Sequence, residues 1–95
     1  RPARLGIGVR DVTPEIADQL RLKIPSGAVV SEVDPSGAAA QSGIRRGDVI
    51  HRVGRTEVGT AVDLTQALGG LESGAEVVLQ IERNGQLAFV TVRVE

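Results

Sequence analysis

The chain has 95 residues, of which 41% are hydrophobic and 24% are charged, and its formal net charge is −1. This size suits one domain, and the composition is that of a globular protein rather than a disordered one. A near-neutral charge and a single aromatic residue, Phe89, argue against nucleic-acid binding, which uses basic surfaces and stacking platforms. No apolar run approaches the roughly 18 residues of a membrane span, so direct membrane insertion is not expected.

The first predicted element is a strand over residues 7–12, which begins inside the run Leu5-Gly6-Ile7-Gly8-Val9. Glycine weakens a strand, so this alternation indicates either a sharp turn or a backbone that another group approaches closely. The chain starts with Arg1 and has no signal-like segment, which is typical of an excised domain. Pro2 fits the end of an interdomain linker.

A first helix is predicted from Pro14 to about Leu22, because Thr13 is a good N-cap and proline favours the first helical position. Glycine, proline and aspartate then separate short valine- or alanine-rich segments. These segments predict a strand over 28–33, a small-residue helix over 38–42 closed by a left-handed Gly43, and a strand over 48–53.

The second half of the chain predicts a helix and a hairpin. Thr60 is the expected N-cap of a helix over 61–68, with Asp63 in its first turn. Strands over 76–82 and 87–94 flank Asn84-Gly85, the strongest short-range hairpin signal. The elements together predict a mostly β fold with two to three short helices.

Residues that carry chemistry are sparse. The only histidine, His51, is expected in a strand as a solvated or packed side chain, and cysteine is absent. The acidic residues are scattered, and no Gly-x-Ser-x-Gly elbow occurs. Asp11 stands where a dinucleotide motif beginning at Gly6 would need its third glycine. The sequence therefore predicts no catalytic residues, no metal site and no cofactor.

Gly6 and Gly8 fit a binding site for an anion rather than a catalytic site. Successive backbone N–H groups in a turn form a nest for an anion such as a carboxylate. A peptide can then add to the edge of the following strand with its C-terminus in the nest. The helix over 61–68 offers one face for a neighbouring pocket, made of Ala61, Leu64, Thr65 and Leu68. The same spacing fits a core face equally well, so both interpretations stay open.

Two motifs resemble a known family. Leu5-Gly6-Ile7-Gly8 is similar to the carboxylate-binding loop of PDZ domains. The stretch from Ser36 to Ile50, a small-residue helix followed by Gly47-Asp48-Val49-Ile50, resembles the most recognisable part of that fold. The resemblance covers essentially the whole chain. It implies a single PDZ domain over residues 1–95, folded as a PDZ-like, partly open antiparallel β-barrel or sandwich.

The resemblance extends to a subgroup. Only four residues precede Leu5, while an extra last strand over 87–94 is available, as in the circularly permuted PDZ domains of bacterial proteases. The helix insert from Thr13 to Leu22 is similar to the HtrA (Do-like) serine proteases. This implies a periplasmic or otherwise extracytoplasmic bacterial protein. Another membrane-associated or processing protease with the same permuted domain is the alternative.

Site residues follow from the resemblance. Leu5, Gly6 and Ile7 are expected to bind a peptide carboxylate, with charge added by Arg4. The expected peptide groove consists of Gly8, Val9, Ala61, Leu64, Thr65 and Leu68. The implied function is non-catalytic recognition of hydrophobic C-termini or unfolded proteins, beside the protease domain of a parent chain. Ala61 replaces the histidine that reads Ser or Thr two residues before the terminus, so no such preference is expected.

An assembly domain with an unused groove is the competing function. Phe89 and the Arg45-Arg46 turn are the features available for docking neighbouring domains. On their own, they are expected to be a partly covered strand residue and a solvated turn.

Overall fold

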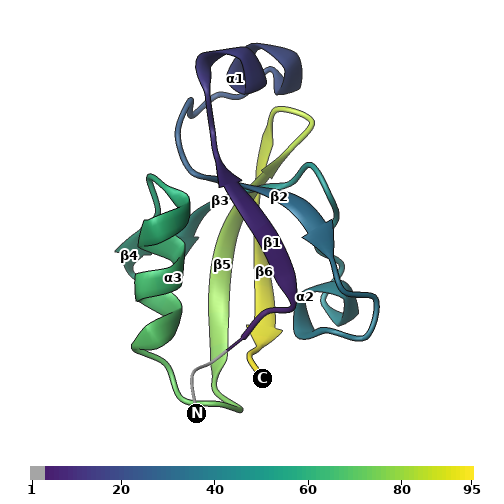
Figure 1. Cartoon of the computed structure of the whole chain (residues 1–95), viewed down its shortest axis with the longest axis vertical. Helices are drawn as coiled ribbons and strands as arrows, with labels where there is room; N and C mark the ends of the chain where they lie inside the picture. The colour runs from purple at the N-terminus through teal and green to yellow at the C-terminus, as the bar shows by residue number, and fades with distance from the viewer. Residues whose placement is uncertain (1–3) are drawn as a thin grey trace.

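The computed structural model describes residues 4–95 as one open antiparallel sheet with three helices (Figure 1). The strands are β1 Ile7–Asp11, β2 Ala28–Val33, β3 Val49–Val53, β4 Thr56–Glu57, β5 Glu76–Arg83 and β6 Gln86–Arg93. The helices are α1 Pro14–Leu20, α2 Ala38–Gln41 and α3 Ala61–Gly69. The mostly β fold with three short helices is confirmed. Residues 1–3, including the linker predicted at Pro2, lie outside the described residues.

The sheet has the strand order β1-β2-β3-β5-β6, with β4 paired to β3. β1 is therefore an edge strand, and α3 packs against β1, β2 and β3. Arg4 and Glu95 exchange two backbone hydrogen bonds of 2.9 Å, so the segment after β6 lies beside the segment before β1. One open edge of the sheet thus runs next to a helix. The permuted strand order and the single domain over 1–95 stay predictions.

Helix capping follows the sequence closely. The Thr60 side chain accepts a hydrogen bond from the Asp63 amide, and the Asp63 carboxylate accepts one from the Thr60 amide, which makes a capping box at the start of α3. Thr13 caps α1 as predicted. The expected end of α1 at Leu22 is wrong, because Arg21 turns into the left-handed region (φ 53°) and closes the helix at Leu20.

The β5–β6 hairpin is confirmed. Asn84 and Gly85 both have positive φ, 54° and 73°, as a two-residue type I′ turn requires. Gly43 closes α2 in the left-handed conformation (φ +88°), as expected. On β6, Val92 is fully buried, whereas Phe89 is 72% exposed. The expectation that Phe89 is partly covered is wrong, because its side chain lies on the face of β6 opposite to the buried Val92.

The core lies between the inner face of the sheet and the helices. Strands β2, β3 and β5 each supply residues to it, and α2 and α3 close it from two sides. Its fully buried larger members are Leu5, Ile50, Leu64, Leu79, Ile81, Val30, Val49, Val92 and Val94. Leu5 and Leu64 also border the space between β1 and α3.

Candidate functional site

The loop before β1 is held to the body of the domain by its carbonyl groups. The Leu5 carbonyl accepts a 2.9 Å hydrogen bond from the Ala39 amide in α2. The Gly6 carbonyl accepts one of the same length from the Asp34 amide, and the Arg4 carbonyl accepts one from Glu95. Three successive peptide planes are therefore fixed in orientation.

The amides of these planes point the other way. In a trans peptide the N–H lies opposite the C=O of the same plane, and none of the described peptides is cis. The N–H groups of Leu5, Gly6 and Ile7 are thus directed away from Glu95, Ala39 and Asp34, respectively. The Leu5 and Gly6 amides donate no hydrogen bond within residues 4–95. Successive backbone amides without an internal partner, as at Leu5 and Gly6, are the chemistry of an anion nest.

Gly6 and Gly8 differ in why they are glycine. Gly6 has φ +72°, and a Cβ there would lie only 3.0 Å from the Gly37 Cα, so the turn itself requires glycine. Gly8 has no positive φ, and a Cβ would meet its neighbours at 3.5 Å or more, which is ordinary packing. The fold explains the first glycine but not the second.

A hollow of about 400 Å³ opens beside the nest, between β1 and α3. It is lined by Arg4, Leu5, Gly6, Ile7, Val9, Leu64, Thr65, Leu68 and Gly69. Gly69 was not predicted, since a helix-terminal glycine carries no pocket signal in the sequence. Gly8 and Ala61 do not line the hollow. The Ala61 amide donates a 2.7 Å hydrogen bond to Asp11 Oδ1, which ties the start of α3 to the end of β1.

Of the α3 leucines, Leu64 is a core residue, while the peptide groove on this face stays a prediction. Leu64 is 2% exposed and belongs to the core, yet it also forms part of the hollow's wall. Leu68 is only partly buried. Thr65 is exposed, and its hydroxyl donates to the Ala61 carbonyl. The hollow is therefore an extension of the core that reaches the surface.

Away from the hollow, Glu82 and His51 form a polar cluster that is buried and bonded to internal partners. Glu82 is fully buried and accepts hydrogen bonds from the backbone amides of Lys23 and Ile24, while His51 Nε2 lies 2.9 Å from its Oε1. Burial favours the neutral acid, but the Lys23 amide and the His51 side chain outweigh it and hold the pKa of Glu82 below its ordinary value. His51 is packed, 5% exposed, and ties the sheet to the segment after α1.

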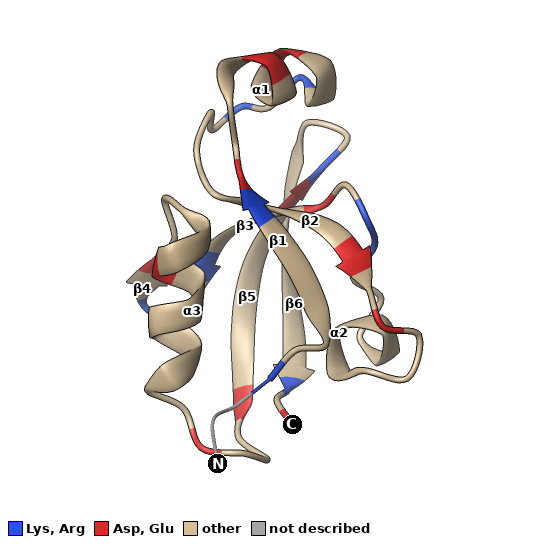
Figure 2. Ribbon diagram, viewed as in Figure 1, with Lys and Arg blue, Asp and Glu red and all other residues tan. Residues whose placement is uncertain are grey.

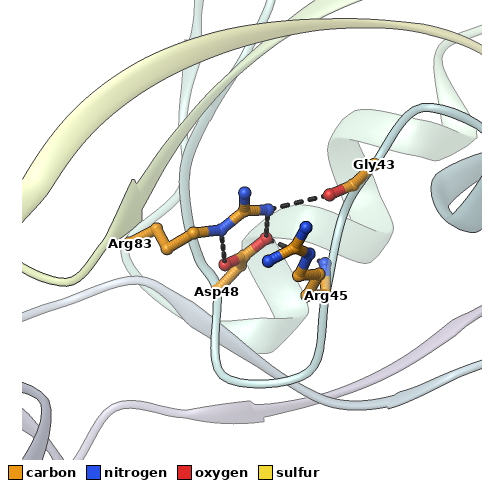
Figure 3. A network of polar contacts seen from close by, with 4 residues as sticks. All are labelled: Gly43, Arg45, Asp48 and Arg83. Carbon is orange, nitrogen blue, oxygen red and sulfur yellow. Dashed lines mark hydrogen bonds and ion pairs between the residues drawn. The ribbon is translucent and has the colours of Figure 1, made fainter.

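Asp48 is the centre of the neighbouring network (Figure 3). Arg83 binds both of its carboxylate oxygens, at 2.7 and 2.6 Å, and also the Gly43 carbonyl. The Arg45 amide donates to Asp48 as well. Hydrogen bonds with Asp48 raise the pKa of Arg83, against the opposing effect of burial. This network was not predicted, because the two partners lie 35 residues apart.

The turn at Arg45-Arg46 is solvated, as expected. Figure 2 shows basic positions near α1 and in the loop before β3. Arg21, Arg45 and Arg46 all line a hollow of about 540 Å³. Among residues 4–95, no three His, Cys, Asp or Glu side chains are placed to hold a metal ion. No helix in this range is long and apolar enough to cross a membrane.

Comparison with known proteins identifies the fold. A family model described as "PDZ domain" matches residues 3–94. The chain belongs to the PDZ domain family. It is similar to a "Probable periplasmic serine endoprotease DegP-like" of Halomonas elongata, 36% identical over 95% of this chain. A protein of the same name from Bartonella henselae is 33% identical over 96%. The chain spans 19% and 18% of these relatives' lengths. Both are periplasmic proteins, in agreement with the location that the resemblance implies.

Solved structures agree with this assignment. The PDZ domain is similar to that in "HtrA-type protease AlgW with decapeptide", with a TM-score of 0.87 and 31% identity, covering 98% of this chain and 29% of that one. It is also similar to the HtrA3 PDZ domain bound to a phage-derived ligand, FGRWV, with a TM-score of 0.82 and 25% identity. That match covers 98% of this chain and 85% of the other. The predicted resemblance to HtrA-type PDZ domains is confirmed.

Proposed function

We propose that this PDZ domain binds the hydrophobic C-termini of proteins in the space between β1 and α3. The observation that carries the proposal is the set of amides at Leu5, Gly6 and Ile7, which point outward because the carbonyls of the same peptide planes are held by the fold. A terminal carboxylate fits this nest, and its peptide then runs antiparallel to β1 as an added strand. Peptide ligands in the similar HtrA-type structures support peptide binding as such.

The hollow accounts for the terminal side chain. Ile7, Val9, Leu64 and Leu68 present aliphatic groups at the side of the nest. Burial of one Leu- or Val-sized side chain contributes about 1.5–3 kcal/mol, and each strand hydrogen bond adds about 1 kcal/mol net. Ordering a flexible peptide opposes this gain, so we expect micromolar affinity, about −8 kcal/mol or weaker. Arg4, exposed beside the nest, adds a favourable charge.

The biological role rests on the relatives. Since they are DegP-like and HtrA-type serine proteases, we infer that this domain belongs to a longer protease. The domain itself is the recognition module. It tethers substrates or regulatory proteins with exposed hydrophobic ends, in the periplasm, beside the protease domain of that parent chain.

The test is a titration with a short peptide that ends in an aliphatic residue, as free acid and as C-terminal amide. We expect the free acid to bind at least about tenfold more tightly, which corresponds to 1.4 kcal/mol. Leu68→Glu should abolish binding, because it places a charge in the hollow. Val62→Glu is the matched control, since Val62 lies on the same helix but is 62% exposed. Equal binding of acid and amide would contradict the proposal.

An assembly role is the second candidate. Val78, Leu87 and Phe89 are exposed together on one face of the β5–β6 hairpin, at 45%, 42% and 72%. Apolar groups clustered in this way often mark protein contacts. Phe89→Ser should then weaken oligomerisation of the parent protein in sedimentation experiments, without changing peptide affinity. An unchanged oligomeric state would remove this candidate.

A further inference from the structure

Gly8 lies where a side chain would fit. An added Cβ would meet the Ser31 hydroxyl and the Glu32 Cβ at 3.5 Å and the Glu32 Oε2 at 3.6 Å, all ordinary contacts. The fold therefore does not demand glycine at this position. What glycine does is to leave the Glu32 carboxylate uncovered on the side of β1 that faces away from α3.

A β-bulge concentrates polar groups at this point. Gly8 pairs with Glu32 and Val9 pairs with Val30, so Ser31 is the extra residue of β2. Both Ser31 and Glu32 consequently lie beside Gly8. Within residues 4–95, no basic side chain forms an ion pair with Glu32. The Glu32 carboxylate is exposed, and Arg45 and Arg46, which line a hollow with it, form no ion pair with it.

The register of a bound peptide follows from the nest. With its carboxylate on the amides of Leu5 to Ile7, an antiparallel peptide places its last residue opposite Ile7 and its penultimate residue opposite Gly8. Directly opposed residues share a face of the sheet, and successive side chains alternate. The last side chain then enters the hollow. The penultimate one extends over Gly8, towards Glu32.

We propose that Glu32, with Ser31, selects a basic penultimate residue in the peptide. This inference rests on the proposed function and names its substrate class: C-termini that end in lysine or arginine followed by an aliphatic residue. Neighbouring strands lie about 4.8 Å apart, so a lysine or arginine side chain crosses the bare backbone of Gly8 easily. Its charged group meets the carboxylate, and the Ser31 hydroxyl supplies a further acceptor.

The test uses three free-acid peptides that differ only in a penultimate Lys, Gln or Glu. An exposed ion pair is expected to make the Lys peptide bind about two- to fivefold more tightly than the Gln peptide, and repulsion should weaken the Glu peptide similarly. The preference should shrink as salt is raised. Glu32→Lys should reverse the order. Glu57→Lys, an equal charge change at an exposed residue of β4, should leave it unchanged.

The results of this test distinguish the role of Glu32 from the proposed recognition of C-termini. Equal affinities for the three peptides, or an order that survives Glu32→Lys, would overturn the role of Glu32 while leaving C-terminal recognition intact. No binding by any of the three would overturn the proposed function and, with it, this inference.

Discussion

Two of the hollows of this PDZ domain, of about 540 Å³ and about 400 Å³, use polar groups in opposite ways. Between β1 and α3, backbone amides of Leu5 and Gly6 point into open space without partners. Beside the hairpin, the carboxylates of Asp48 and Glu82 are enclosed and fully engaged by internal donors. The hollow of about 540 Å³ is thus bordered by charged groups that hold the fold together. The hollow of about 400 Å³ is bordered by backbone donors that have no partner within residues 4–95. Unsatisfied hydrogen-bonding capacity, rather than volume, distinguishes a binding site from a structural network.

The largest expected effect on stability comes from removing a carboxylate of the buried network. Glu82→Ala leaves His51 and the amides of Lys23 and Ile24 without an acceptor in a buried place. We expect the free energy of unfolding to fall by about 3–5 kcal/mol in urea titrations. The affinity of the folded fraction for a C-terminal peptide should be unchanged. Glu57→Ala, at an exposed surface pair, should cost less than about 1 kcal/mol. Equal effects of the two variants would show that the network is not structural.

The next largest effect is a difference in stability between substitutions at the two glycines near the nest, Gly6 and Gly8. Gly6→Ala forces a positive φ and a 3.0 Å contact with the Gly37 Cα, so we expect a loss of about 1–3 kcal/mol of stability together with weaker peptide binding. Gly8→Ala meets only ordinary contacts and should change stability by less than about 1 kcal/mol. Thermal unfolding of both variants checks the contrast. A Gly8→Ala variant as unstable as Gly6→Ala would contradict it.

Acid should affect the network through Glu82. Its folded-state pKa lies below the ordinary 4.5, so its contribution to stability is present above that value and is lost as the pH falls through the lower folded pKa. We expect the free energy of unfolding to decrease on acidification below about pH 4.5. Glu82→Gln should flatten this dependence. A variant with the same acid sensitivity as the wild type would assign the effect to other carboxylates.

The smallest effect concerns the far end of the groove. Ala61 offers no side-chain hydrogen-bonding group, and its amide is already bound to Asp11. Peptides with Thr or Val two residues before the terminus should therefore bind within about twofold of one another in calorimetric titrations. A tenfold preference for Thr would mean that another residue, such as Thr65, reads that position.

The sequence predicted local features well. Thr60 with Asp63 and Asn84 with Gly85 act over one turn of chain, and the structure contains the cap and the hairpin that they indicate. The contacts of His51 with Glu82 and of Asp48 with Arg83 span 31 and 35 residues. They depend on the register between β3 and β5, including a bulge between Ile50 and Arg52, which no local pattern encodes.

At the candidate site too, local features were predicted from the sequence and long-range ones were not. The motif Leu5-Gly6-Ile7 located the nest, but its orientation depends on Ala39 and Asp34 holding the carbonyls. Ala61 was predicted in the groove from helical spacing and from the resemblance, and it is not among the residues that line the hollow. Helical periodicity defines a face of α3 but does not define how far along that face the hollow extends.

The most direct test of the central claim is a two-dimensional NMR titration of the 15N-labelled domain with a free-acid peptide and with its amide. We expect the free acid to shift the amide signals of Leu5, Gly6 and Ile7 and those of Val9 and Leu68, and the amide peptide to leave the first three nearly unmoved. Shifts centred instead on Arg21, Arg45 and Arg46 would place the ligand in the larger hollow and contradict the account.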